Sequence, residues 1–422
     1  MASPYLEVFR SPRIAAVMVL GFSSGLPLAL TGSTLQAWLA VSAIDIKTIA
    51  WFSWIGLPYA LKFLWSPLMD RYVPPWLGRR RGWMLLTQFG LITGIAAMAL
   101  SPPAEMLWLL GIAALWVAFM SASQDVVIDA YRTDVLAASE RGAGAAVGVF
   151  GYRMAMLASG ALALVLGDQI GWQTTYGIMA LLMLVGVVTA WLAPEPVAPV
   201  SVPRTLREAI TQPLADMFAR PGAMSLLALV LLYKFGDALA GTLTTAFLIR
   251  GAGFTPTDVG VVNKGLGLAS LLLGALAGGV LLARMSLYRA LFLFGVLQAI
   301  SNLSFAWLAW AGKSYGLLVF AVGFENLASG MGTAAFVAFA MALCNHSFSA
   351  TQYALLSAIA SLGRILFGPA AGTMVLSLDW GGFFVLTFVA ALPGLALVWL
   401  MRERISEVER SAALQPVASA SS

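Results

Sequence analysis

The chain has 422 residues, of which 60% are apolar and only 10% are charged. A soluble domain carries roughly 45–50% apolar and about 25% charged residues, so this chain could not cover a water-facing surface. The composition excludes a soluble enzyme and a disordered chain, and the single cysteine, Cys344, excludes a secreted disulfide scaffold. It also argues against a nucleic-acid binder, although the net charge is +5.

Long apolar segments recur along the whole chain. A membrane-spanning helix needs ~20 apolar residues, and these segments are too long and continuous for barrel strands. The first is also too long for a cleavable signal peptide, and more spans follow it. We predict an all-α membrane protein with twelve spans, at residues 14–38, 48–69, 83–101, 105–130, 142–167, 173–193, 223–249, 257–283, 287–311, 314–342, 348–376 and 380–401.

Basic residues divide unequally between the two sets of loops. Both termini and one set of alternate loops hold 16 of the 24 Lys and Arg residues, whereas the opposite loops hold only Lys47, Arg250 and Lys313. Cytoplasmic loops carry the excess of Lys and Arg. The sequence therefore predicts that both termini lie in the cytoplasm, as an even number of spans requires.

A proline-rich break separates the chain into two halves of six spans each. Residues 194–222 contain six prolines, and Thr205 with Glu208 resembles a capping box that would begin a short amphipathic helix. We predict an N-terminal bundle over 1–193, a cytoplasmic linker over 194–222, a C-terminal bundle over 223–401 and a disordered cytoplasmic tail over 402–422.

The two halves repeat each other in order. Four features recur 200 to 211 positions apart: Lys62 with Lys264, Asp125 with Glu325, Arg153 with Arg364, and residues 32–35 with 241–244. Two parallel six-helix repeats resemble the plan of the major facilitator superfamily. That resemblance implies a substrate site at the midplane, between the halves.

The loop after the second span carries a charge cluster. Residues 70–81 (DRYVPPWLGRRR) resemble the superfamily signature D-[RK]-x-G-[RK]-[RK], with an insertion before Gly78. In that family these charges hold the cytoplasmic helix ends together. The alternative is a simple orientation signal, which would not need the acid at the helix end. The resemblance implies a cytoplasmic gate formed by Asp70, Arg71, Arg79 and Arg80, with Arg132.

Two acids share one face of the fourth span. Asp125 and Asp129 are four residues apart, and a carboxylate inside a membrane must be paired, wetted or protonated. A carboxyl that exchanges its proton would serve proton coupling. The alternative is a structural ion pair with Arg153 on the fifth span. Glu325 on the tenth span could be a second proton site or a partner for Arg364.

Five basic residues lie within the predicted spans. Arg153 and Arg364 cannot discharge, so each needs an acid partner or an anionic ligand, and carboxylates of a substrate would fit. Lys62, Lys234 and Lys264, with Asn263, add further donors, although Asp237 could be a local partner for Lys234. We find no motif for a metal or a cofactor and expect neither.

Several segments resemble a narrower family, the AmpG-type muropeptide permeases. They cover about residues 5–400 and include 21–30 (GFSSGLPLAL), 35–38 (LQAW), 62–72 (KFLWSPLMDRY), 78–83 (GRRRGW), 123–130, 141–146, 151–153, 247–254, 262–264, 324–327 and 347–352. The resemblance implies a bacterial inner-membrane importer of N-acetylglucosaminyl-1,6-anhydro-N-acetylmuramyl peptides. The proton gradient would drive uptake, which serves cell-wall recycling and, indirectly, β-lactamase induction.

On that basis we assign expected roles to the polar residues. Asp125 would be the main proton carrier, assisted by Asp129 or Glu325. The remaining residues would bind substrate. Basic residues would bind its carboxylates, and amide and aromatic side chains would contact its sugars. The set is Gln36, Trp38, Lys62, Gln124, Tyr152, Arg153, Lys234, Asn263, Lys264, Asn326 and Arg364.

Two other classes remain open from the residues alone. Eukaryotic acetyl-CoA transporters look similar around Gln124, Asp125 and Asp129, so a major facilitator for another anionic substrate is an alternative. A membrane enzyme of wall-precursor chemistry would usually show several histidines or a catalytic loop, whereas this chain has one histidine. We expect a monomeric transporter rather than an enzyme.

Overall fold

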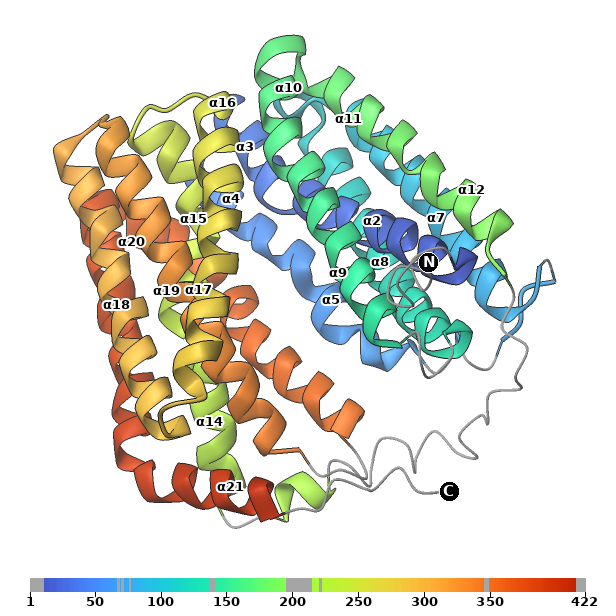
Figure 1. Ribbon diagram of the computed structural model, residues 1–422. Helices are drawn as coiled ribbons and strands as arrows, with labels where there is room; N and C mark the ends of the chain where they lie inside the picture. Colours follow the sequence, from blue (N-terminus) through green and yellow to red (C-terminus); the bar gives the residue numbers. More distant parts are fainter. Residues whose placement is uncertain are drawn as a thin grey trace, which may run out of the picture. The chain divides into compact units, whose positions relative to one another are not determined.

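The computed structural model describes residues 11–66, 69, 72–75, 77–136, 141–194, 215–219, 222–344 and 349–414. Within these ranges the secondary structure is entirely helical (Figure 1). The chain forms two compact units, one containing residues 1–204 and 254–264 and the other residues 205–253 and 265–422. The prediction of an all-helical fold is confirmed.

The first unit contains long helices interrupted by short irregular turns. Its elements are α2 (Pro12–Thr31), α3 (Ser33–Val41), α4 (Ile46–Trp51), η2 (Phe52–Gly56), α5 (Leu57–Leu61), η3 (Lys62–Leu64), α7 (Arg79–Ala99), α8 (Pro103–Val135), α9 (Arg141–Met156), η4 (Leu157–Leu162), α10 (Ala163–Ile170), α11 (Trp172–Leu182), α12 (Leu184–Leu192) and α16 (Pro256–Asp258), with most of η6 (Val259–Leu266).

The second unit is built from longer, more continuous helices, and Figure 1 shows α18, α19 and α20 running along one another. Its elements are α14 (Ala223–Tyr233), α15 (Phe235–Ala246), η5 (Phe247–Gly251), α17 (Gly267–Leu282), α18 (Leu287–Ala311), α19 (Tyr315–Ala342), α20 (Ser349–Leu400) and α21 (Arg402–Leu414).

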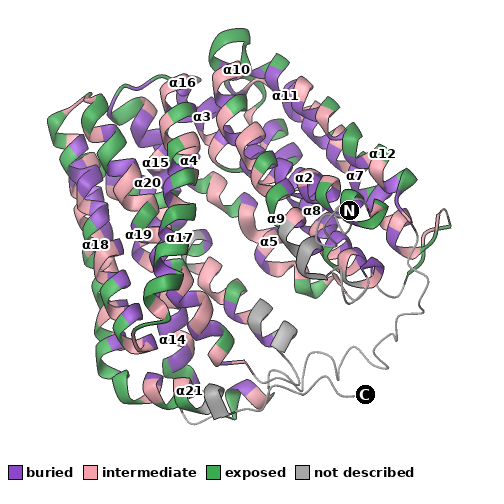
Figure 2. Ribbon diagram, viewed as in Figure 1, coloured by how far each residue is buried: buried purple, intermediate pink, exposed green. Residues whose placement is uncertain are grey.

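Burial is arranged as a membrane requires. Large apolar side chains such as Trp108, Leu276 and Trp310 are exposed on the outer faces, whereas Gln88 and Gln298 are buried inside the bundles. Figure 2 shows exposed residues spread along the helices rather than confined to their ends. Lipid, unlike water, can cover such apolar faces. The chain is a multi-pass membrane protein.

Ten helices in the described ranges are long and apolar enough to cross a membrane. The difference from the predicted twelve lies in two places. Residues 349–400 form α20, which holds the last two predicted spans and breaks at Asp379, where φ is 59°. The second predicted span is divided among α4, η2, α5 and η3, because Gly56 and Pro58 interrupt the helix.

Glycines allow close helix contact in the first unit. A Cβ atom at Gly21 of α2 would meet the carbonyl group of Gly148 on α9, and one at Gly151 would meet the carbonyl of Met18. Helices in membranes associate through such small residues, because no hydrophobic force drives apolar surfaces together in lipid. This seam fixes α2, which carries Ser23 and Ser24, against α9, which carries Arg153.

The C-terminal end differs from its prediction. Residues 402–414, which we predicted to be disordered, form α21. Ile405 is fully buried in the apolar core of the second unit, and a carboxylate oxygen of Glu409 accepts a hydrogen bond from the Leu287 N–H at 3.0 Å. The prediction of disorder is therefore wrong for this helix, because its apolar stripe has a core to pack on. The short helix predicted within 194–222 lies outside the described residues.

Candidate functional site

The first unit holds a buried acid against a lysine and a serine. Asp125 projects from α8, and its Oδ2 lies 3.9 Å from the Lys62 Nζ of η3. The Ser24 hydroxyl of α2 donates a hydrogen bond to Asp125 Oδ1. The Asp125 side chain is 17% exposed and that of Lys62 36%, so the pair faces an accessible region of the unit. Three separate helical segments thus meet at one carboxylate.

A tyrosine and a second acid lie near this pair. Tyr152 of α9 lies within electrostatic reach of Asp125, Asp129 and Arg153. Asp129 forms a 3.0 Å ion pair with Arg132 one turn along α8, and its side chain is 60% exposed. Asp125 is therefore the inner of the two acids, and Asp129 belongs to the exposed end of the helix.

Arg153 of α9 is a cation within a predicted membrane span. Its guanidinium contacts the sulfur of Met156 at 3.8 Å, and it forms no ion pair with any residue that the structure describes. The structural pair between Arg153 and Asp129 that we considered is thus absent from the described residues. A half-buried guanidinium without an acid is a site for an anion.

Two residues expected to touch sugars are packed inside the unit instead. Trp38 is only 3% exposed and stacks on Trp172 with a ring separation of 6.2 Å and against Tyr176 at 5.0 Å. Gln124 is fully buried, and its amide lies 3.5 Å from the Ser23 hydroxyl. Both expectations are corrected, because the two side chains stabilise helix packing. The sequence spacing of an aromatic residue near a span end does not distinguish a packing role from a sugar-binding role.

The predicted gate contains one strong ion pair. Arg80, at the start of α7, donates from Nε to Asp134 Oδ2 of α8 at 2.8 Å, and the two side chains are 8% and 13% exposed. Asp70 and Arg71 lie outside the described residues. Arg79 begins α7, and Arg132 pairs with Asp129 as described above. Of the predicted cluster, Arg80 thus joins two helices of the first unit.

The second unit has its own polar centre. Asp237, in the first turn of α15, accepts hydrogen bonds on Oδ2 from the Gln298 amide of α18 and from the Ser329 hydroxyl of α19 at 3.1 Å. Lys234, which we considered as its local partner, instead donates from Nζ to the Thr333 hydroxyl at 3.1 Å. The two charges interact electrostatically without forming an ion pair in the structure.

The other predicted residues are distributed over several elements. Glu325 and Asn326 are adjacent on α19, and the Asn326 amide donates to Glu325 Oε2 at 2.7 Å. Asn263 and Lys264 are half-buried in η6, a π-helical stretch, and such stretches occur frequently at functional sites. Gln36 is half-buried in α3. Arg364 lies in α20, and its side chain is outside what the structure describes.

Several site residues are absent from the sequence prediction. The structure adds Ser24, Asp134, Gln298 and Ser329, each of which contacts a charged side chain across helices. It also adds Gln88, whose amide donates to the Ser23 hydroxyl. Amides and hydroxyls inside apolar spans were an available signal, because polar side chains in membranes pair across helices. Their partners depend on how each helix is rotated, which sequence spacing within one helix does not give.

The acidic side chains in the described ranges of the chain do not form clusters. Within those ranges no three His, Cys, Asp or Glu side chains lie close enough together to hold a metal ion. The polar centres consist of single carboxylates with amide, hydroxyl and ammonium groups. Such an arrangement can bind protons and anions.

The family follows from comparison with known proteins. The model of the Major Facilitator Superfamily matches residues 14–366. The chain is 53% identical over 407 residues to the anhydromuropeptide permease of Escherichia coli K12, covering 96% of this chain and 83% of that protein. An uncharacterized protein of Haemophilus influenzae is 38% identical over 396 residues, covering 90% and 92%. The chain therefore belongs to the Major Facilitator Superfamily and, within it, to the family of the anhydromuropeptide permease.

Solved structures show the same fold at low sequence identity. The nucleoside transporter NupG matches with a TM-score of 0.71 and 14% identity, covering 92% of this chain and 99% of that one. A POT family transporter in complex with a conjugated peptide matches with a TM-score of 0.72 and 12% identity, covering 93% and 96%. The chain is a transporter rather than an enzyme.

Proposed function

We propose that this chain imports anhydromuropeptides across the bacterial inner membrane by proton-coupled alternating access, as a monomer with both termini in the cytoplasm. The observation that carries the proposal is the 53% identity, over 96% of the chain, to a protein named for that substrate. The charges within the first unit support it, because they provide a carboxyl for the proton and cations for the substrate.

The Lys62–Asp125 pair supplies a physical basis for coupling. At 3.9 Å the two groups are at the outer limit of an ion pair, and the attraction exists only while Asp125 is ionised. A proton on Asp125 removes that attraction and releases Lys62 to bind a substrate carboxylate. Loss of the proton restores the pair, so Lys62 binds either the acid or the substrate.

Arg153 supplies the second contact with the substrate. Anhydromuropeptides carry carboxylates on their stem peptides, and a guanidinium binds a carboxylate through two parallel hydrogen bonds. Because Arg153 has no acid partner among the described residues, a substrate carboxylate would offset the cost of a charge inside the membrane. Asn263, Lys264 and Gln36 would contact the rest of the substrate.

Uptake by purified protein in proteoliposomes tests the function. Labelled anhydromuropeptide should accumulate when the outside is acidic, and a protonophore should abolish accumulation without abolishing exchange of internal for external substrate. Uptake of muropeptides with stem peptides of differing length, measured with and without acetyl-CoA as competitor, would define the substrate class. Absence of both accumulation and exchange, or strong competition by acetyl-CoA, would contradict the proposal.

Substitution of Asp125 tests the assigned proton site. Asp125→Asn should retain exchange and lower gradient-driven accumulation, because the amide cannot take a proton. Asp45→Asn is a matched control, since it makes the same chemical change at an exposed helix cap. Full gradient-driven uptake by Asp125→Asn would show that the proton binds elsewhere.

A further inference from the structure

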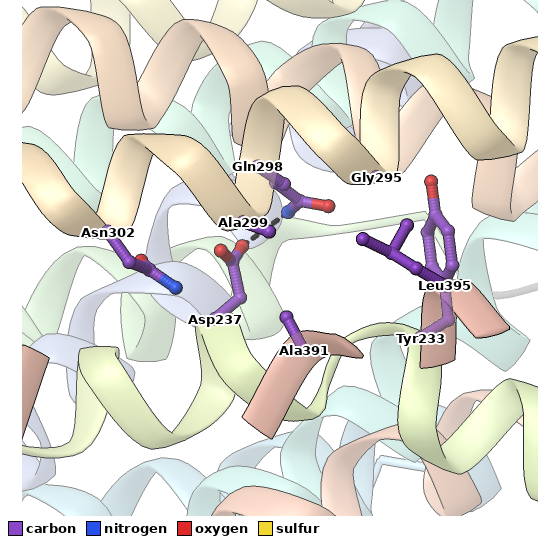
Figure 3. A pocket seen from close by; sticks show the side chains of 8 residues that line it. All are labelled: Tyr233, Asp237, Gly295, Gln298, Ala299, Asn302, Ala391 and Leu395. Carbon is purple, nitrogen blue, oxygen red and sulfur yellow. Dashed lines mark hydrogen bonds between the residues drawn. The ribbon is translucent and has the colours of Figure 1, made fainter. Parts of the chain in front are cut away.

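A small cavity lies beside Asp237, inside the helical bundle of the second unit. Figure 3 shows its lining, with Gln298 and Asn302 projecting from α18 toward Asp237 on α15 and with Ala391 and Leu395 of α20 opposite. The cavity has a volume of about 10 Å³, measured to the centre of a water-sized sphere. That is about the room that one water molecule needs.

Two buried amides face this cavity with unused hydrogen-bonding groups. Gln298 is 4% exposed and Asn302 1%. Gln298 Oε1 and both amide atoms of Asn302 have no hydrogen-bond partner among the described residues. Each unpaired buried group costs about 1–3 kcal/mol. A ligand that both donates and accepts hydrogen bonds would satisfy them, and water does so in this volume.

The carboxylate itself uses only one of its oxygens. Both hydrogen bonds that Asp237 accepts, from Gln298 and from Ser329, go to Oδ2. Within the described part of the chain, Oδ1 accepts no hydrogen bond, and the side chain lines the cavity. A carboxylate oxygen that faces a water-sized cavity is a place where a proton can arrive.

The partners of Asp237 fit both of its protonation states. Gln298 and Ser329 can each donate to a carboxylate, and each can also accept from a carboxylic acid after an amide flip or a hydroxyl rotation. Groups that only donate, such as backbone N–H or guanidinium, would hold the acid permanently ionised. No such group bonds Asp237 in the described structure, so none of its hydrogen-bond partners is restricted to the ionised state.

Few charged side chains in the described part of the chain lie near Asp237. Lys234 lies at the junction of α14 and α15, and its Nζ donates to Thr333 and also interacts with Glu325 of α19. The N-terminus of α15 favours the carboxylate. Tyr233 of α14 donates its hydroxyl to the Leu291 carbonyl at 3.0 Å, α18 presents only the two amides, and α20 presents apolar side chains. The positive charge of Lys234 is thus shared between two acids.

From this geometry we propose that Asp237, with a water molecule in the cavity between Asp237, Gln298 and Asn302, is a second proton-binding site in the C-terminal bundle. It is separate from Asp125, which belongs to the first unit. The water links Oδ1 to the amides of α18, and the proton binds Oδ1 while Gln298 and Ser329 continue to hold Oδ2. This deepens the proposed function, on which its role in transport rests.

The repeat between the halves supports this assignment. In the first unit Gln88 of α7 donates to Ser23 of α2 at 2.5 Å, and 210 positions later Gln298 donates to Asp237. In the first unit a serine of α2 donates to an acid on α8, whereas in the second a serine of α19 donates to an acid on α15. Within the described residues, each bundle therefore contains a serine-bound acid, placed on a different helix of the repeat.

Infrared difference spectroscopy of the full-length protein tests proton binding without any substrate. Between about pH 8 and about pH 5, the range in which a coupling carboxyl must exchange its proton, the wild type should gain a C=O band of protonated carboxyl. The part of this band that Asp237 contributes should be missing in Asp237→Asn. It should remain in Asp125→Asn and in the control Asp45→Asn. A spectrum of Asp237→Asn identical to that of the wild type would overturn the proposal.

A second variant protects the test against a folding defect. Ser329→Ala keeps the carboxyl and removes one hydrogen bond to Oδ2, so the Asp237 band should remain and change its frequency. An unchanged frequency would contradict the assignment, even if Asp237→Asn failed to fold. In proteoliposomes, Asp237→Asn should keep exchange and lower accumulation by about tenfold per pH unit of gradient, because one coupled proton is lost.

The two proposals fail in distinguishable ways. If wild-type protein transports no muropeptide, the proposed substrate is wrong, and the infrared test still decides whether Asp237 binds a proton. If the wild type accumulates muropeptide and Asp237→Asn does so equally well, the second proton site is wrong and the proposed function stands.

Discussion

Arg153 combines a permanent charge with a position inside a membrane span. A guanidinium stays protonated in proteins, so the free energy of this site depends on which anion approaches it. The Met156 sulfur is its described contact, and sulfur is a weak acceptor. Since no acid among the described residues pairs with Arg153, the proposed substrate carboxylate is the anion expected to bind it.

Substitution of Arg153 should weaken substrate binding more than turnover. A hydrogen bond to a charged group is worth about 1.5–3 kcal/mol, so Arg153→Ala should raise KM roughly ten- to hundredfold, at a tenfold change per 1.4 kcal/mol. Arg153→Lys should recover only part of this, because an ammonium does not bind a carboxylate bidentately. Initial uptake rates over a range of substrate concentrations give both constants.

A substrate analogue provides the control for that prediction. An anhydromuropeptide with amidated carboxyl groups should have a similar KM for wild type and for Arg153→Ala, since it has no carboxylate for Arg153 to bind. Arg402→Lys, at an exposed position over the Trp399 ring, should leave KM unchanged. A wild-type KM in Arg153→Ala would refute the anion-binding role.

At the residue scale, the sequence gives the charges but not their partners. Asp125, Lys62 and Arg153 are visible as charges in apolar spans, and the structure brings the first two together. The bond from Ser24 to Asp125 spans 101 positions and depends on the rotation of α2 relative to α8. Trp38 shows the converse, because its burial depends on Trp172 and Tyr176 from a distant helix.

The contact between α2 and α9 depends on glycine at the scale of elements. A Cβ atom at Gly21 would come too close to the Gly148 carbonyl for either backbone to stay in place. Gly21→Ala should therefore destabilise the protein by about 1–3 kcal/mol, the usual cost of overpacking. Thermal unfolding in detergent, followed by tryptophan fluorescence, measures the loss.

Gly177 is the matched control for the helix seam. It lies in α11, and a Cβ atom there would meet nothing within 4 Å. Gly177→Ala should leave the unfolding temperature unchanged or raise it, because alanine favours helix by up to about 1 kcal/mol. Equal destabilisation by both substitutions would show that the seam is not the cause.

The start of α4 depends on an ionised cap. Hydrogen bonds from the Thr48 hydroxyl and backbone N–H lower the pKa of Asp45 below its ordinary value, and the N–H bond is 2.9 Å long. Because the folded pKa is the lower one, the stabilisation is present above the unfolded pKa of about 3.9 and is lost as pH falls through the folded value. Protection of the Thr48 amide against hydrogen exchange should thus differ between wild type and Asp45→Ala near neutral pH, and the two values should converge in acid.

The Asp45→Asn substitution separates the effect of the helix cap from the effect of its negative charge. Asparagine also caps helices, so this variant should protect the Thr48 amide nearly as well as the wild type and show no change with pH between about pH 6 and about pH 3. A pH-dependent protection that persists in Asp45→Asn would assign the titration to another group.

Elements were predictable where a single physical requirement dominates. Long apolar runs give the spans, because a helix must cross ~30 Å of hydrocarbon, and Gly171 and Gly312, with φ of 87° and 79°, mark two turns between helices. The interrupted helix from Ile46 to Leu64 and the ordered α21 were not predicted. The interruption follows from Gly56 and Pro58, which a hydropathy average does not register. The helix α21 depends on packing partners elsewhere in the chain.

The whole molecule carries its orientation in its charge distribution. Sixteen Lys and Arg residues lie at the termini and in one set of loops, and three lie in the other set. This bias predicts that the richer side faces the cytoplasm. Lys313, between α18 and α19, belongs to the poorer set. Arg402, at the start of α21, belongs to the richer one.

Cysteine accessibility should show these two positions on opposite sides of the membrane. The single native cysteine, Cys344, can be replaced by alanine, and cysteine introduced at Lys313 or Arg402, both exposed. A membrane-impermeant maleimide should label Lys313→Cys in right-side-out vesicles and Arg402→Cys in inverted vesicles, because only the loops rich in Lys and Arg remain in the cytoplasm. Retained muropeptide uptake by both variants would confirm that the labelled protein is folded, and the reverse labelling pattern would show that the charge bias does not set the topology.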